Sequence, residues 1–167
     1  MNRIILLICL FLFSGCSIFK RVQNHNTVFP SKFIEISHGT YTAEDEEIEV
    51  SKKSPMGLHT YVQNVKLLMT CDTIIGKVGE NFGIEYMIKT IKDTTLLIKK
   101  VWEFPRPMIN EKGGKYEKLE RELTIDTNAN LFTSYEFEKD FEILKGNWIL
   151  KFYYCNNLVY KKKFVIK

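Results

Sequence analysis

The side chains best suited to metal binding or acid–base catalysis in this sequence are three histidines, and their spacing favours neither role. His25, His38 and His59 are far apart in the chain, and none has the paired cysteines or the close histidine partner of a zinc site. The chain also lacks a Gly-x-Ser-x-Gly nucleophile elbow, a phosphate-binding glycine-rich loop and a dinucleotide fingerprint. We therefore expect no metal and no cofactor, and we assign no catalytic residue.

Aspartate and glutamate are plentiful enough that two carboxylates could still meet across a fold. Such a pair is what glycoside hydrolysis requires, so a hydrolase whose site is assembled from distant strands is the alternative to a non-catalytic protein. Many of these acidic residues alternate with apolar ones, as Glu120 and Glu122 do. That alternation is typical of the solvent-facing side of a β-strand, and we expect that the protein is not an enzyme.

Two cysteines and two threonines are candidates for covalent modification. Cys71 and Cys155 could form one disulfide in an oxidising compartment, but the sequence does not show whether their Cα atoms lie within about 7 Å. Thr73 and Thr94 each follow an aspartate and match the short Asp-Ser/Thr-apolar pattern that some Gram-negative bacteria O-glycosylate in exported proteins. The sequence leaves both modifications open.

The N-terminus has the pattern of a bacterial lipoprotein signal peptide. One positive charge, at Arg3, precedes an uninterrupted apolar run over residues 4–13, which is shorter than the roughly 20 residues of a membrane-spanning helix. The following tetrapeptide, FSGC, resembles a lipobox, although Phe13 replaces the usual leucine. We expect cleavage after residue 15, lipidation of Cys16, and a flexible tether over residues 16–31. Residues 32–167 then form a single domain.

The predicted address is the bacterial cell envelope, with the lipid anchor in a membrane. Ser17 follows the lipidated cysteine where an inner-membrane retention signal would have aspartate, so we expect the outer membrane, with the domain facing the periplasm. Loss of Arg3 leaves a mature net charge of about +3, which is too small to indicate a nucleic-acid partner.

The domain alternates apolar and polar residues with a period of two, which indicates β-strands with one buried face. The alternation covers residues 82–89, 96–104, 119–125 and 131–137, and it is clearest in a final hairpin over residues 148–154 and 158–166. Trp102 and Trp148 are in phase with it, so we predict that both are core residues. Pro105 is expected to end its strand because it has no amide hydrogen. About seven or eight strands with short turns indicate an all-β, antiparallel sandwich of the immunoglobulin type.

Two further details of the strands can be tested. In the last hairpin we place Asn156 and Asn157 at the turn and Leu158 on the buried face. Phe132 and Tyr153 are out of phase with the buried faces of their strands, so they are the best candidates for an exposed binding surface.

Several segments resemble an uncharacterised family of exported bacterial domains. They are IGKVGENFGIEY at residues 75–86, WEFP at 102–105, GNW at 146–148 and KFV at 163–165. The resemblance covers about residues 33–167 and implies an immunoglobulin-like sandwich; it carries no known catalytic residue. We therefore expect a non-catalytic binding or adaptor module whose partner is an envelope protein or a glycan.

Overall fold

The computed structural model describes residues 32–50, 54–56 and 58–167, and it describes the backbone alone for residues 43–50 and 58–63. The predicted signal peptide and the whole of the predicted tether, including Cys16, lie outside these residues. His25 also lies outside them. Cleavage after residue 15, lipidation of Cys16 and the flexible tether therefore remain predictions.

The all-β prediction is confirmed for the described residues, which form strands joined by turns and one short 3₁₀ helix. No helix among them has the length and apolar character needed to cross a membrane. The elements are β1 (Lys32–Val50), β2 (Leu58–Thr70), β3 (Thr73–Ile74), β4 (Asn81–Lys89), β5 (Thr95–Ile109), β6 (Lys115–Asp126), β7 (Leu131–Glu136), η1 (Asp140–Glu142), β8 (Gly146–Tyr154) and β9 (Asn157–Ile166).

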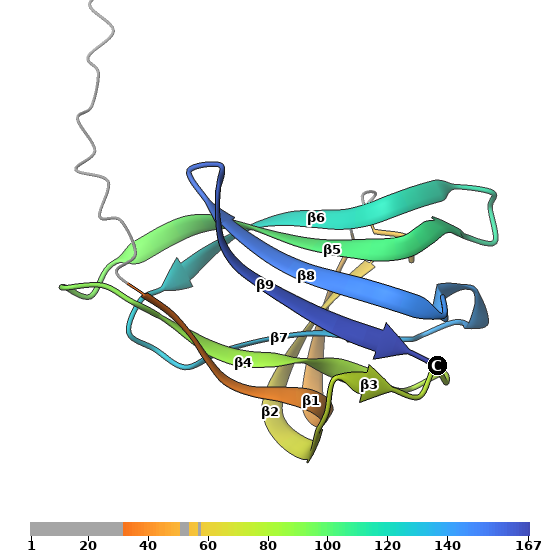
Figure 1. Ribbon diagram of the computed structural model, residues 1–167, viewed down its shortest axis with the longest axis horizontal. Helices are drawn as coiled ribbons and strands as arrows, with labels where there is room; N and C mark the ends of the chain where they lie inside the picture. The colour runs from red at the N-terminus through yellow and green to blue at the C-terminus, as the bar shows by residue number, and fades with distance from the viewer. Residues whose placement is uncertain (1–31, 51–53, 57) are drawn as a thin grey trace, which may run out of the picture.

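The strands form two sheets that pack face to face (Figure 1). One sheet has the order β2-β1-β4-β7 and the other has the order β3-β9-β8-β5-β6. All pairings are antiparallel except that of the two-residue strand β3, which runs parallel to β9. The expectation of a purely antiparallel sandwich is therefore corrected: the chain crosses from one sheet to the other between β2 and β3, and this crossing brings β3 alongside β9 in the same direction.

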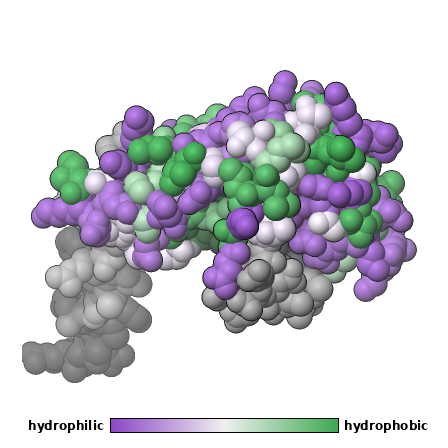
Figure 2. All heavy atoms as spheres, turned by 90° about the horizontal axis from the view of Figure 1, so that it is seen from below, coloured by the Kyte–Doolittle hydropathy of each residue, from purple (hydrophilic) through white to green (hydrophobic). Residues whose placement is uncertain are grey.

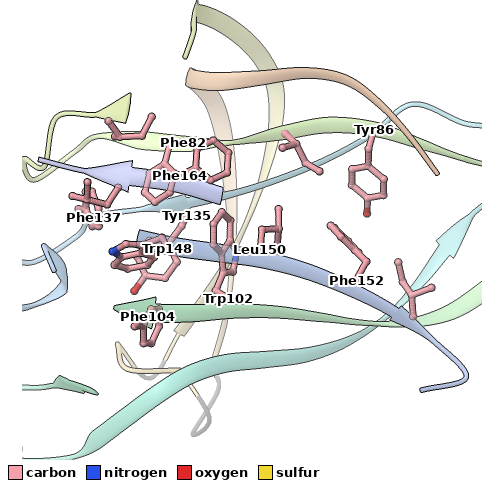
Figure 3. Close-up of a cluster of buried hydrophobic side chains, with 14 of the residues drawn as sticks. Phe82, Tyr86, Trp102, Phe104, Tyr135, Phe137, Trp148, Leu150, Phe152 and Phe164 are labelled. Carbon is pink, nitrogen blue, oxygen red and sulfur yellow. The ribbon is translucent and has the colours of Figure 1, made fainter. Parts of the chain in front are cut away.

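Aromatic side chains from both sheets fill the interior (Figure 3). Trp102 and Trp148 are 1% and 0% exposed, so the sequence placed both correctly in the core. The ring of Phe82 from the opposite sheet packs edge-on against both, with centroids 5.5 and 5.8 Å away. Trp148 also donates a 2.7 Å hydrogen bond from Nε1 to the Leu144 carbonyl. Burial of this set supplies the main driving force for folding.

Pro105 interrupts its strand but does not end it, contrary to the prediction. β5 continues to Ile109, and its pairing with β6 stops at Glu103 and resumes at Met108. Because Pro105 has no amide hydrogen to donate, the pairing between β5 and β6 is interrupted around it, and the strand itself continues.

The turn of the last hairpin lies one residue earlier than predicted. Cys155 and Asn156 are its central residues, both with positive φ, and Tyr154 pairs with Asn157. A register shift between Phe152 and Tyr153 follows, and Leu158 is 50% exposed instead of buried. The reason is that a one-residue change of register reverses the face on which a side chain lies.

Candidate functional site

Five polar residues meet where one side of the sandwich is closed, and we call them the polar cluster. Glu35 and His38 come from β1, Asp72 from the connection between β2 and β3, and Tyr160 and Lys162 from β9. Residues 32–38 of β1 pair with β4 alone, because the pairing of β1 with β2 begins at Gly39. The polar cluster thus joins an open strand edge of one sheet to the other sheet.

The members of the polar cluster contact one another closely. His38 Nδ1 lies 2.6 Å from Glu35 Oε1, and His38 Nε2 lies 3.3 Å from Asp72 Oδ1. Lys162 Nζ is 2.8 Å from Asp72 Oδ1 and 3.3 Å from Glu35 Oε1. The Tyr160 hydroxyl donates a hydrogen bond to Glu35 Oε2.

These contacts shift the ionisation of three members. Burial opposes ionisation of Glu35, but the Tyr160 hydrogen bond and the Lys162 charge outweigh it and hold the Glu35 pKa below its usual value. The hydrogen bond from Lys162 is the main cause of a lowered pKa for Asp72. Burial, reinforced by the Glu35 carboxylate, raises the pKa of Tyr160. The polar cluster therefore favours two ionised carboxylates and a protonated tyrosine.

The chemistry available to the polar cluster is limited because its groups are directed at one another. Each carboxylate is held by a cation, and the Tyr160 hydroxyl donates its hydrogen bond to Glu35 instead of to a substrate. No group of three or more metal-binding side chains suited to a metal ion occurs in the described part of the chain. The arrangement is best explained as a clamp between the two sheets.

A second feature, the outer edge of β2, is exposed and apolar. Leu67, Leu68 and Met69 are 37%, 59% and 55% exposed, and they are consecutive. β2 is the last strand of its sheet. On its outer side β2 pairs with no other described strand, so its outer backbone groups are accompanied by apolar side chains, which is unusual for a strand edge in contact with water.

The other strand edges differ from the β2 edge. β6 carries a row of exposed charges at Lys115, Glu117, Lys118, Glu120 and Glu122. β7 has six residues and β3 has two. Charged or very short edges prevent unwanted pairing between sheets. Among the described edge strands, β2 therefore combines length with apolar side chains.

Apolar side chains elsewhere on the surface are more scattered. No two of the other exposed large apolar residues among the described ones are consecutive; they are Ile36, Ile75, Val78, Ile91, Leu97, Ile109 and Leu158. Figure 2 looks at the side of the molecule on which β1, β2 and β4 lie, and hydrophobic and hydrophilic groups are interspersed there. Single exposed apolar residues are ordinary in soluble domains. The consecutive run on β2 is what distinguishes it from this background.

Cys71 and Cys155 are both free, so the disulfide left open by the sequence is not formed. Cys155 lies in the turn that precedes β9, whereas Cys71 precedes β3, which pairs with the last residues of β9. Nearly the whole of β9 separates them, a distance of roughly 30 Å at the rise of a strand. A bridge requires Cα atoms within about 7 Å.

The remaining candidates occupy separate places in the fold. Thr73 is exposed on β3, and Thr94 is half-buried just before β5, where its backbone amide donates to Thr127 Oγ1. O-glycosylation of both stays a prediction. The side chain of His59 lies outside the described residues, and His38 is the one histidine that the structure places in a polar site.

The two aromatic residues predicted to form an exposed surface are each covered by a neighbour. Phe132 is half-buried and packs edge-on against Tyr41, with ring centroids 4.7 Å apart. Tyr153 is half-buried, and Lys99 Nζ lies 5.2 Å from its ring centroid. Both residues do lie outside the core, but their rings are occupied and provide no open platform.

Two further ionisable groups lie away from the polar cluster: Lys100 is half-buried and Glu142 is fully buried. Lys100 follows the inward phase of β5, and its Nζ donates a 2.7 Å hydrogen bond to Thr133 Oγ1 on the opposite sheet. Burial lowers the pKa of Lys100 to about 8. Glu142 is 1% exposed and accepts a 2.6 Å hydrogen bond from Tyr135. Burial raises the pKa of Glu142 despite this bond.

Sequence reasoning missed both the polar cluster and the β2 edge. The polar cluster has no sequence signal, because Glu35 and Lys162 are brought together only by the packing of the sheets. The β2 edge does have a sequence signal. Leu67, Leu68 and Met69 are consecutive apolar residues that break the alternation, so at least one of them must face away from the core.

No protein-family model and no curated protein sequence matches this chain. Among solved structures, an immunoglobulin-like protein from Pseudomonas aeruginosa matches with a TM-score of 0.58 and 16% identity, over 83% of this chain and 99% of that chain. A DNA-bound alkylpurine DNA glycosylase from Pseudomonas fluorescens matches with a TM-score of 0.38 and 8% identity, over 57% of this chain and 28% of that chain, and carries no argument. The immunoglobulin-like fold is therefore confirmed, and function must be argued from the site.

Proposed function

We propose that this protein is a lipid-anchored, non-catalytic binding module of the bacterial cell envelope that contacts a partner protein through the edge of β2. The lipid on Cys16 would hold it in the outer membrane, with the domain facing the periplasm. The observation that carries the binding role is the exposed apolar run Leu67, Leu68 and Met69 on a terminal strand.

The chemistry of a strand edge favours a protein partner over a glycan at this place. Unpaired amides and carbonyls can form a ladder with an extended peptide, and alternate side chains then supply specificity. Apolar side chains beside the ladder add stability because they leave water when the partner strand is added. A glycan offers no such regular backbone.

The alternative function, a hydrolase, would have to use the polar cluster. Among the described residues, this is the one solvent-accessible group that we find with both carboxylates and a histidine. Its carboxylates and His38 are, however, paired with one another. Turnover of an ester, glycoside, peptide or phosphate substrate that His38→Gln abolishes, in a protein that still folds, would favour the hydrolase.

The proposed function can be tested with two leucines of equal exposure. Leu68 on β2 and Leu97 on β5 are both 59% exposed, but β5 already has a neighbouring strand on each side. Envelope proteins are cross-linked chemically in intact cells that produce the wild type, Leu68→Lys or Leu97→Lys. We expect a discrete partner with the wild type and Leu97→Lys and its loss with Leu68→Lys, at unchanged urea midpoints. Equal recovery with all three would contradict the proposal.

A further inference from the structure

A hollow of about 300 Å³ lies at one end of the sandwich, where three connections meet. The wall contains residues 54–56 between β1 and β2, the β5–β6 turn with the start of β6, and the segment between β7 and β8; Met56, Tyr116 and Phe141 each come from one of these parts. The size is at the lower limit of small-molecule sites and is sufficient for one or two sugar rings. Loops held at one end of a β-sandwich are common positions for binding sites.

Asn110 fixes the shape of the hollow. Its Oδ1 accepts hydrogen bonds from the backbone amides of Lys112 and Gly114, at 3.1 and 2.7 Å. Its Nδ2 donates a 3.0 Å bond to the Pro55 carbonyl, which ties the β5–β6 turn to residues 54–56. Two of the three connections are therefore held together before any ligand binds, which lowers the entropic cost of binding.

Gly114 lets Tyr116 lie close to the turn. A Cβ at position 114 would come 3.1 Å from Tyr116 Cε2 and 3.0 Å from Asn110 Oδ1, closer than side chains normally approach. The half-buried tyrosine ring is thus supported from behind by the turn and forms a firm wall of the hollow.

The wall of the hollow combines apolar and positively charged groups. Tyr116, Phe141 and Met56 are half-buried and supply the apolar part. Lys112 and Lys139 are exposed at its rim, and neither ammonium group forms an ion pair with a described residue. Among the described residues of the wall, Glu111 is the one acidic side chain, against two lysines. A matching ligand has an apolar face and a negative charge.

We propose that this hollow binds an acidic sugar, with a C–H face of the ring against Tyr116 or Phe141 and the carboxylate near Lys112 and Lys139. A neutral sugar would offer no opposite charge to the two ammonium groups. Aromatic rings stack on the C–H faces of sugars, and an ammonium group at the rim attracts a carboxylate. The inference uses the hollow alone and does not depend on the β2 edge.

The test uses full-length protein purified in detergent and three matched pairs of ligands. These are glucuronate and glucose, galacturonate and galactose, and N-acetylmuramate and N-acetylglucosamine, measured by ligand-observed NMR. We expect at least one acid to bind, with a dissociation constant on the order of 1 mM, and its neutral counterpart to bind at least ten times more weakly. The double variant Lys112→Gln/Lys139→Gln should lose the preference.

The control is Lys92→Gln/Lys161→Gln, which removes the same charge from two exposed lysines near the other end of the sandwich. It should leave the preference for the acid unchanged. The inference is overturned if no acid binds, if acid and neutral sugars bind equally, or if both double variants weaken binding to the same extent. Gly114→Ala adds an independent readout: it should weaken both members of a pair, because it displaces Tyr116 and leaves the lysines in place.

Discussion

At the scale of single residues, burial and hydrogen bonding determine how much each core side chain contributes to stability. Trp148 and Trp102 are equally buried, but the indole N–H of Trp148 has an acceptor, whereas that of Trp102 has no hydrogen-bond partner among the described residues. An unsatisfied buried donor lowers stability. The two tryptophans therefore make unequal contributions although both were predicted from the same alternation.

Trp148→Ala should lower the free energy of unfolding by about 3 to 5 kcal/mol, because removal of a fully buried indole leaves a cavity that the sheets cannot close. Urea denaturation measures the change. As a control, Trp148→Phe should cost more than Trp102→Phe, since only the first leaves the Leu144 carbonyl without its donor. An unchanged midpoint for Trp148→Ala would mean that this side chain is exposed.

Lys100→Met should raise stability at pH 7 by up to about 3 kcal/mol, because the charged amine is buried and methionine is not penalised for burial. In the wild type the pKa of Lys100 is lowered to about 8, so the unfolded state binds more protons above that pH. Wild-type stability should therefore rise between pH 8 and about 10. The variant should lack this rise, and an identical pH dependence for both proteins would refute the assignment.

At the scale of the elements, the sequence predicts strands better than it predicts their arrangement. The alternation of residues 82–88 correctly identified the buried face of β4, because burial of one sheet face is a local property. The pairing of β3 with β9 and the exposure of Leu158 depend on contacts between distant strands and on a register shift, which no local pattern records. The polar cluster was unpredictable for the same reason.

Gly39→Ala should weaken the attachment of β2 to β1. Gly39 has φ +140°, and a Cβ there would lie 1.9 Å from the Met69 carbonyl oxygen. We expect a loss of more than about 2 kcal/mol from strain and displaced backbone, with faster amide hydrogen exchange in residues 64–70. Gly79→Ala is the matched control: it also has positive φ, at +82°, but no atom lies within 4 Å, so it should cost less.

At the scale of the whole molecule, the proposal joins a membrane address to a binding domain. The address depends on Cys16, and the domain supplies a clamp on one side and an apolar strand edge on another. A tether benefits a protein that acts by contact, because it raises the effective concentration of the domain near partners in the same envelope.

Cys16→Ser should abolish acylation, because the thiol of this residue is the predicted acyl acceptor. Cells that produce the wild type or the variant are grown with a clickable fatty acid, and label on the protein is compared after gel separation. We expect label on the wild type alone, together with slower migration of the uncleaved variant. Equal labelling of both would refute the lipoprotein assignment.

The measurement that tests the binding role most directly is photo-cross-linking from the β2 edge in living cells. A photo-reactive amino acid is placed at position 68 in one strain and at position 97 in another, so that the exposure of the replaced leucine is the same in both. We predict one discrete cross-linked envelope protein from position 68 and none from position 97. The same pattern of products from both positions, or no product from position 68, would contradict the account.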